Sequence, residues 1–260
     1  MKKYFALILF SITLIGCTTP PEFSEPAASV EQSTPSTPPT EVPLLEEYPN
    51  LSWEFSTISV NDSDIDYATL LPPDYDPSKT YPLLIALPPG GQDRRMVDAG
   101  LDGFWKVGAL YDFIIVSPAK PADSNYMSEG SLLLPAFVDH LHNTFNIDGK
   151  PHLGGVSNGG ISTFKAGLER PDLYQSLTVL PGYARTSSGD PKTLADLKIT
   201  IYVGANDGQW VTNSRATNDW LVNAGHTDTQ LEIFADEGHI IQPLNGDGAG
   251  KIFLRLLDQS

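Results

Sequence analysis

The fold of this chain is decided by the stretch His152-Leu153-Gly154-Gly155-Val156-Ser157-Asn158-Gly159-Gly160. Its centre fits the pattern G-x-S-x-G, in which a strand enters, turns sharply at the serine and leaves as a helix. The pattern predicts a strained backbone at Ser157. It also predicts glycine two residues before and two residues after the serine, because a Cβ atom would not fit there. The serine hydroxyl then stands at the N-terminus of a helix, where the helix dipole favours developing negative charge.

The residues on both sides of this stretch fit a strand, a turn and a helix. Residues 151–156 predict a short buried strand, and residues 161–169 predict a helix that ends at Arg170-Pro171 because proline cannot continue it. A plain glycine loop is the alternative, since a chain with 22 glycines can meet the pattern by chance. The flanking strand and helix favour a nucleophile elbow.

The N-terminus resembles a targeting signal. Two lysines precede an apolar run over residues 4–15, which is too short to span a bilayer as a mature helix. The run ends in Leu14-Ile15-Gly16-Cys17, which resembles the lipobox of bacterial lipoproteins. The resemblance implies that residues 1–16 are a signal peptide and that Cys17 is lipidated. It further implies a protein of the bacterial cell envelope that faces outside the cytoplasm and contacts the membrane through its lipid anchor only. An ordinary signal peptide with a chance cysteine is the alternative.

A linker follows, and then a single domain. Residues 17–47 are rich in Pro, Ser and Thr and show no apolar periodicity, which is typical of a tether that does not fold. Residues 48–260 are long enough for one domain with a sizeable core. Cys17 is the only cysteine, so no disulfide can form within the chain. The formal net charge of −16 argues against nucleic acid and anionic polymers as partners.

Apolar strands alternate with helices through this domain. Such alternation predicts an α/β fold with a mostly parallel central sheet and helices on both faces, and ligands gather at the carboxyl ends of its strands. The expected strands cover residues 53–60, 65–71, 81–87, 113–116, 151–156, 177–180, 199–203 and 231–234, and the expected helices cover residues 96–110, 132–145, 161–169, 211–223 and 251–257.

Three polar residues follow the ends of predicted strands in the order Ser157, Asp207, His239. A serine hydroxyl needs a base at neutral pH, and an imidazole base needs a carboxylate that fixes its tautomer. The alternatives are that Asp207 only forms a turn and that His239 is a surface histidine. Asp236 is disfavoured as the partner of His239 because it lies too near in sequence.

The domain resembles the α/β-hydrolase family, and within it the small secreted esterases similar to feruloyl and acetyl esterases and short-chain polyester depolymerases. The resemblance covers nearly all of residues 50–260 and rests on residues 155–160, 204–207, 237–239 and 87–92. It implies an α/β-hydrolase fold and a serine esterase that works through an acyl-serine intermediate. In that mechanism Ser157 attacks, His239 carries the proton and Asp207 orients His239.

The family also needs backbone N–H groups that stabilise an oxyanion. The resemblance places one at Asn158, directly after the nucleophile, and the other in the loop that follows residues 83–87. Family members often carry His-Gly-Gly-Gly in that loop, whereas this chain has Pro88-Pro89-Gly90-Gly91. Because proline has no N–H group, the second donor must be Gly91 or Gln92.

The substrate is predicted from the connection between the strands at 177–180 and 199–203. Residues 181–197 are short and rich in turn formers, so they hold no cap domain and leave an open cleft. Aromatic residues near that cleft are candidates for its walls, and Tyr183 and Trp210 are favoured because each closely follows a strand end; the others are Phe104, Trp105 and Tyr126. An open aromatic cleft favours short or aromatic acyl esters, on a small molecule or on a polymer.

No metal or cofactor is expected. His140 and His142 lie two residues apart on a predicted helix and therefore face different sides, and no phosphate-binding glycine loop occurs. Two other functions stay open: a catalytically silent binding module of the same fold, and a serine peptidase of prolyl-oligopeptidase type.

Overall fold

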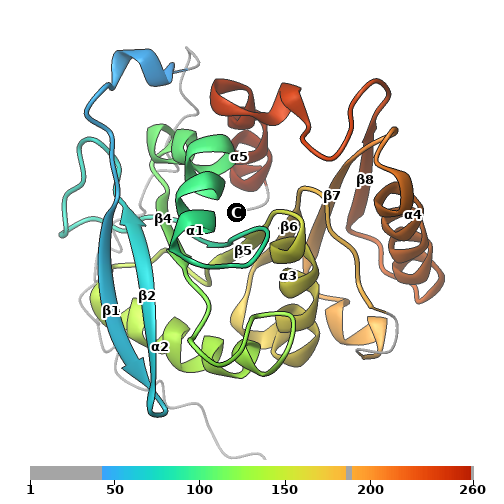
Figure 1. Cartoon of the computed structure of the whole chain (residues 1–260), viewed down its shortest axis with the longest axis horizontal. Helices are drawn as coiled ribbons and strands as arrows, with labels where there is room; N and C mark the ends of the chain where they lie inside the picture. Colours follow the sequence, from blue (N-terminus) through green and yellow to red (C-terminus); the bar gives the residue numbers. More distant parts are fainter. Residues whose placement is uncertain (1–42, 186–188, 259–260) are drawn as a thin grey trace, which may run out of the picture. The chain divides into compact units, whose positions relative to one another are not determined.

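A computed structural model describes residues 43–185 and 189–258. In this part of the chain, eight strands form one sheet in the order β1-β2-β4-β3-β5-β6-β7-β8 (Figure 1). β1 and β2 pair antiparallel, β2 pairs antiparallel with β4, and the remaining pairs are parallel. The strands are β1 (Glu54–Val60), β2 (Ser63–Leu70), β3 (Leu83–Leu87), β4 (Ile114–Pro118), β5 (His152–Gly155), β6 (Ser176–Val179), β7 (Lys198–Gly204) and β8 (Thr229–Phe234).

The predicted sheet is confirmed, with bounds that differ by a few residues. Every residue of β3 and of β4 is buried, as expected for strands that helices cover on both faces. The helices are α1 (Arg94–Gly100), α2 (Leu134–Thr144), α3 (Asn158–Glu169), α4 (Gly208–Asn223) and α5 (Gly250–Leu257). α2, α3 and α4 contribute to one apolar core, and α1 and α5 contribute to the other.

The helix expected over residues 96–110 is confirmed as a helical segment, but its winding changes along its length. α1 ends at Gly100, a π-helical turn covers Leu101–Trp105 and a 3-10 helix covers Lys106–Tyr111. The 3-10 segment packs closely on α5. A Cβ atom at Gly108 would lie 2.2 Å from the ring of Phe253 in α5, so the backbone here must press directly on that ring.

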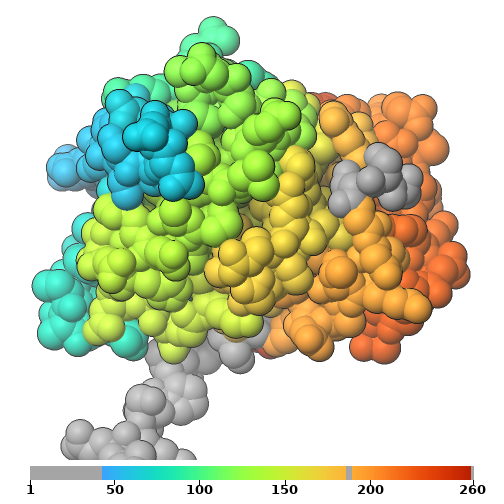
Figure 2. Space-filling view, turned by 90° about the horizontal axis from the view of Figure 1, so that it is seen from below, coloured from blue at the N-terminus to red at the C-terminus, as the bar shows by residue number. Residues whose placement is uncertain are grey.

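The antiparallel edge of the sheet packs on α2. Tyr67 of β2 makes an edge-to-face contact with Phe137 of α2 at 5.3 Å between ring centroids, and its hydroxyl lies 2.9 Å from His140 Nε2. In the space-filling view, the blue hairpin of β1 and β2 lies beside the green segment that contains α2 (Figure 2). His140 is thus a packing residue of this edge.

The predicted signal peptide, Cys17 and most of the predicted linker lie outside the described residues. The described chain begins inside the expected linker, where Leu45–Glu47 forms a 3-10 turn and the N–H of Leu45 donates to Asp247 Oδ1 at 2.7 Å. The described residues of the connection between β6 and β7 contain one short 3-10 helix, Pro191–Leu194. Along the described ranges, no helix has the length and apolar composition that a membrane span needs.

His152 begins β5, far from the serine end of that strand. Its side chain is buried, its Nδ1 lies 2.7 Å from Ser176 Oγ and its ring packs on Phe113. Burial, with a smaller contribution from the positive charge of Lys198, lowers the pKa of His152 to about 4. The folded protein therefore holds His152 as a neutral imidazole at neutral pH.

This burial predicts a loss of stability in acid. The unfolded chain takes up a proton at His152 near its ordinary pKa of about 6.5, whereas the folded chain resists it down to about pH 4. The free energy of unfolding therefore has its full value above about pH 6.5. As the pH falls to about 4, protonation of His152 in the unfolded chain lowers this free energy by on the order of 3 kcal/mol. Urea unfolding of the native chain and of His152→Gln, each at about pH 6.5 and about pH 4, measures this loss of stability. Equal pH dependence in the two proteins would contradict the assignment, as would an NMR titration that places the His152 pKa near 6.5.

Candidate active site

Ser157 stands on a strained turn between β5 and α3. Its backbone has φ 57° and ψ −118°, which non-glycine residues seldom adopt. A Cβ atom at Gly155 would lie 2.3 Å from the carbonyl group of Gly159, and a Cβ atom at Gly159 would lie 2.1 Å from the carbonyl oxygen of Leu87. The predicted elbow and both of its glycines are confirmed. The helix begins at Asn158, earlier than expected, so its N-terminus directly follows the serine.

Ser157, His239 and Asp207 form one hydrogen-bonded chain. His239 Nε2 lies 2.9 Å from Ser157 Oγ, and His239 Nδ1 lies 2.9 Å and 3.1 Å from the two carboxylate oxygens of Asp207. The Asp207 side chain is 9% exposed and that of His239 is 37% exposed, so the acid is shielded while the base faces solvent. This arrangement can take a proton from the serine hydroxyl and pass it to a departing group.

Tight backbone packing brings the acid and the base together. Asp207 follows β7 and His239 lies in the loop after β8. A Cβ atom at Gly204 would lie 2.2 Å from the carbonyl oxygen of Gly238, and the N–H of Asn206 donates to the carbonyl oxygen of Glu237 at 2.9 Å. The two loops are therefore in direct contact. The carboxylate on His239 is that of Asp207, which is more than a turn former.

Two of the predicted aromatic residues lie beside His239. The ring centroid of Trp210, in the first turn of α4, is 4.9 Å from that of His239, and Tyr183 packs edge-to-face on Trp210 at 5.2 Å. Both side chains are partly exposed and can contact a bound molecule. The other aromatic candidates are buried in the core, away from solvent: Phe104, Trp105 and Tyr126.

The two candidates for the second oxyanion donor differ in availability. The N–H of Gln92 donates to the carbonyl oxygen of Pro89 at 3.0 Å, in a turn with φ of 54° at Gly90 and 60° at Gln92. Because this hydrogen bond already uses the N–H group, the expectation that Gln92 could be the oxyanion donor is wrong. The N–H groups of Gly91 and Asn158 have no acceptor among the described residues. Asn158 Nδ2 donates to the carbonyl oxygen of Gly90 at 2.9 Å, which joins the elbow to this loop.

The side chain of Gln92 has a role that the sequence did not indicate. It is fully buried, and its Nε2 donates to Ser162 Oγ at 2.9 Å and to the carbonyl oxygen of Pro88 at 3.3 Å. Its Oε1 accepts the N–H of Tyr126 at 3.0 Å. Ser162 Oγ in turn donates to the carbonyl oxygen of Asn158 at 2.9 Å. One amide therefore ties the loop after β3 to α3 and to the loop after β4.

We expect Gln92→Met to destabilise the protein although its size and shape are nearly kept. Methionine leaves the N–H of Tyr126 and the carbonyl oxygen of Pro88 buried without their partner, which should lower the free energy of unfolding by on the order of 3 kcal/mol. Gln209→Met is the matched control, because Gln209 is exposed and bonds only Asn213 within α4. A loss in urea unfolding no larger than that of the control would show that the Gln92 contacts contribute little.

The described residues contain no group of three or more His, Cys, Asp or Glu side chains that could hold a metal ion.

Comparisons with known proteins find likeness in structure but not in sequence. No model of a protein family matches the chain, and no curated protein matches it. A thermostable esterase superposes with a TM-score of 0.63 at 18% identity, over 80% of this chain and 62% of the esterase chain. A ferulic acid esterase from Anaeromyces mucronatus, in complex with ferulic acid, superposes with a TM-score of 0.58 at 14% identity, over 79% of this chain and 90% of the other.

A peptidase shares the same architecture. The acylaminoacyl peptidase of Pyrococcus horikoshii superposes with a TM-score of 0.61 at 13% identity, over 82% of this chain. This chain spans only 42% of the peptidase chain. At these identities the likeness is one of fold, which esterases and peptidases share.

Proposed function

We propose that this chain, which has the α/β-hydrolase fold, is a serine hydrolase that cleaves carboxylic esters through an acyl-serine intermediate. One observation carries the proposal: Ser157 Oγ lies 2.9 Å from His239 Nε2 on a strained elbow, and Asp207 holds the other nitrogen of that histidine. A silent binding module would have no need of strain at the serine or of a shielded acid behind the base.

The geometry gives each residue a role in acyl transfer. His239 Nε2 takes the proton as Ser157 Oγ attacks the ester carbonyl carbon, and Asp207 stabilises the imidazolium that forms. We assign the oxyanion to the N–H groups of Asn158 and Gly91, which have no acceptor among the described residues. His239 then gives its proton to the leaving alcohol oxygen. A water molecule, activated by the same histidine, releases the acid and restores the serine.

The substrate we infer is an ester with a short or aromatic acyl group, on a small molecule or on a polymer. Trp210 and Tyr183 offer flat apolar surface beside His239, and such surface binds aromatic rings and chains. The described part of the connection between β6 and β7 holds only a short 3-10 helix, which is little material to enclose a long chain. The architecture shared with a ferulic acid esterase is compatible with this proposal.

The decisive experiment compares the native chain with Ser157→Ala on acetyl, feruloyl, butyryl and decanoyl esters of one alcohol. We expect the native chain to show its highest kcat/KM on short or aromatic acyl groups. We expect Ser157→Ala to lose activity on all of them, by about 10⁴-fold or more, while its unfolding curve stays unchanged. Retained activity in the variant would overturn the mechanism. A preference for the decanoyl ester would point to a covered apolar pocket and refute the substrate class.

We further propose that the protein is a lipoprotein of the bacterial cell envelope, anchored through Cys17. The basis is the short apolar run that ends at this cysteine. Because acyl chains would be its only anchor, Cys17→Ser should move the full chain from the membrane fraction to the soluble one. Fractionation of bacterial cells that express both forms measures this. A variant that stays with the membranes would disprove the anchor.

A further inference from the structure

A hollow of about 280 Å³ lies against the loop after β3, the loop that carries Gly91. The backbone of Gly90 and Gly91 forms one side, and residues of the loop after β4, among them Lys120, Asp123 and Asn125, form the other. Gly90 also accepts the hydrogen bond from Asn158 Nδ2, and Asn158 directly follows the nucleophile. The hollow therefore begins at the loop that carries Gly91, the proposed oxyanion donor.

Hydrogen bonds hold the two sides of this hollow at a fixed distance. The N–H of Lys120 donates to the carbonyl oxygen of Gln92 at 2.6 Å, and the N–H of Tyr126 donates to Gln92 Oε1 at 3.0 Å. The hydroxyl of Tyr126 donates to the carbonyl oxygen of Ala119 at 2.7 Å, which closes the loop on itself. The hollow is thus a preformed feature and needs no rearrangement to receive a ligand.

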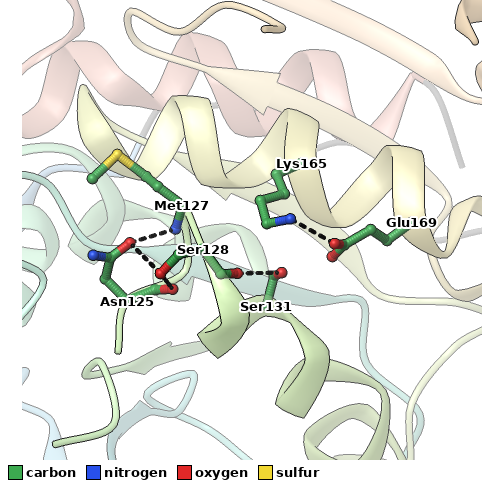
Figure 3. A network of polar contacts seen from close by, with 6 residues as sticks. All are labelled: Asn125, Met127, Ser128, Ser131, Lys165 and Glu169. Carbon is green, nitrogen blue, oxygen red and sulfur yellow. Dashed lines mark hydrogen bonds and ion pairs between the residues drawn. The ribbon is translucent and has the colours of Figure 1, made fainter. Parts of the chain in front are cut away.

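The outer part of the loop is braced by its own side chains. Asn125 Oδ1 accepts the N–H of Met127 at 3.0 Å and the hydroxyl of Ser128, and Ser131 Oγ donates to the carbonyl oxygen of Ser128 (Figure 3). In the same view Lys165 of α3 points to Glu169, with which it forms an ion pair at 2.6 Å. The charge of this neighbouring lysine is therefore already compensated.

Lys120 differs from Lys165 because no carboxylate compensates it. Its ammonium group lies 3.4 Å from the carbonyl oxygens of Pro121 and Ala122, and among the described residues it forms no salt bridge. Lys120 is half-buried, whereas Asp123 is exposed, so water screens the aspartate more strongly. In a chain of net charge −16, an uncompensated and half-buried cation in a hollow favours an anionic ligand group.

The strand order indicates where the parts of a bound ester lie relative to this hollow. Ser157 follows β5; the loops that form the hollow follow β3 and β4 on one side of it, and Asp207 and His239 follow β7 and β8 on the other. Since His239 gives its proton to the leaving oxygen, the alcohol oxygen lies next to His239. The acyl group is bonded to the same carbonyl carbon, and one that turns away from Trp210 extends past Gly91 toward the hollow.

We propose that the hollow is an acyl subsite that selects short acyl groups ending in a carboxylate, and that Lys120 is the residue that binds this carboxylate. The proposal rests on the esterase function and adds a substrate class to it, the monoesters of short dicarboxylic acids. The hollow has room for a short chain only, and the lysine supplies a charge-assisted hydrogen bond at its end.

Two methyl esters of nearly equal shape test the proposal. Monomethyl glutarate ends in a carboxylate, and methyl 5-methylhexanoate ends in an uncharged isopropyl group. We expect the native chain to prefer the glutarate by about tenfold in kcat/KM, mainly through KM. Lys120→Met should abolish this preference and leave the uncharged ester unaffected, whereas Lys120→Arg should retain most of it. Asp123→Asn should increase the preference, because it removes the opposing charge.

Lys79→Met is the matched control and should change the rate on neither ester. Lys79 is exposed and precedes β3, so it lies near the amino end of that strand, whereas the hollow lies at the carboxyl end. An equal loss on both esters in Lys120→Met would mean that Lys120 acts on the oxyanion or on folding, and would overturn the subsite. An unchanged preference in Lys120→Met, or no preference in the native chain, would also overturn it while leaving the esterase function intact. Failure of the native chain to hydrolyse any ester would refute the esterase function itself.

Discussion

The active site depends on close contact between backbone segments at the elbow. The turn that holds Ser157 is wedged between the ends of β3 and β6, where the carbonyl oxygens of Leu87 and Pro181 would lie 2.1 Å and 2.3 Å from Cβ atoms at Gly159 and Gly160. Only glycine permits such an approach. The contact compensates the strain at the serine, because a backbone enclosed on both sides cannot relax to an easier conformation.

The features that could be predicted from the sequence are those that depend on residues close together in the chain. Apolar runs marked the strands, and the spacing of Gly155, Ser157 and Gly159 marked the elbow, because both patterns reflect local backbone geometry. The clamp at Gln92 could not be predicted, since its partners Tyr126 and Ser162 are 34 and 70 residues away and leave no local pattern. The change of winding after α1 was not predicted, and the contact of Gly108 with the Phe253 ring, which comes from the far end of the chain, leaves no local pattern either.

The sheet order also separates the chemical tasks of the site. β5 lies between β3 and β6, so the proposed nucleophile has the proposed oxyanion loop on one side and the proposed acid and base on the other. Each side has its own packing contacts: the Gln92 amide on the first, and the meeting of Gly204 with Gly238 on the second. Substrate selection on one side can therefore change without disturbing proton transfer on the other.

The position of β8 gives the two halves of the site unequal local stability. β8 is an edge strand of the described sheet, all of its residues are only partly buried, and its one strand neighbour there is β7. The ion pair of Lys251 with Glu232, and the same ammonium group over the Phe234 ring, join it to α5, and because the Lys251 side chain is 53% exposed, water and salt weaken these contacts. Edge strands open locally at lower free energy than central ones. Because His239 follows β8 and Ser157 follows the central strand β5, we expect local opening at β8 to displace the proposed base while the proposed nucleophile keeps its position.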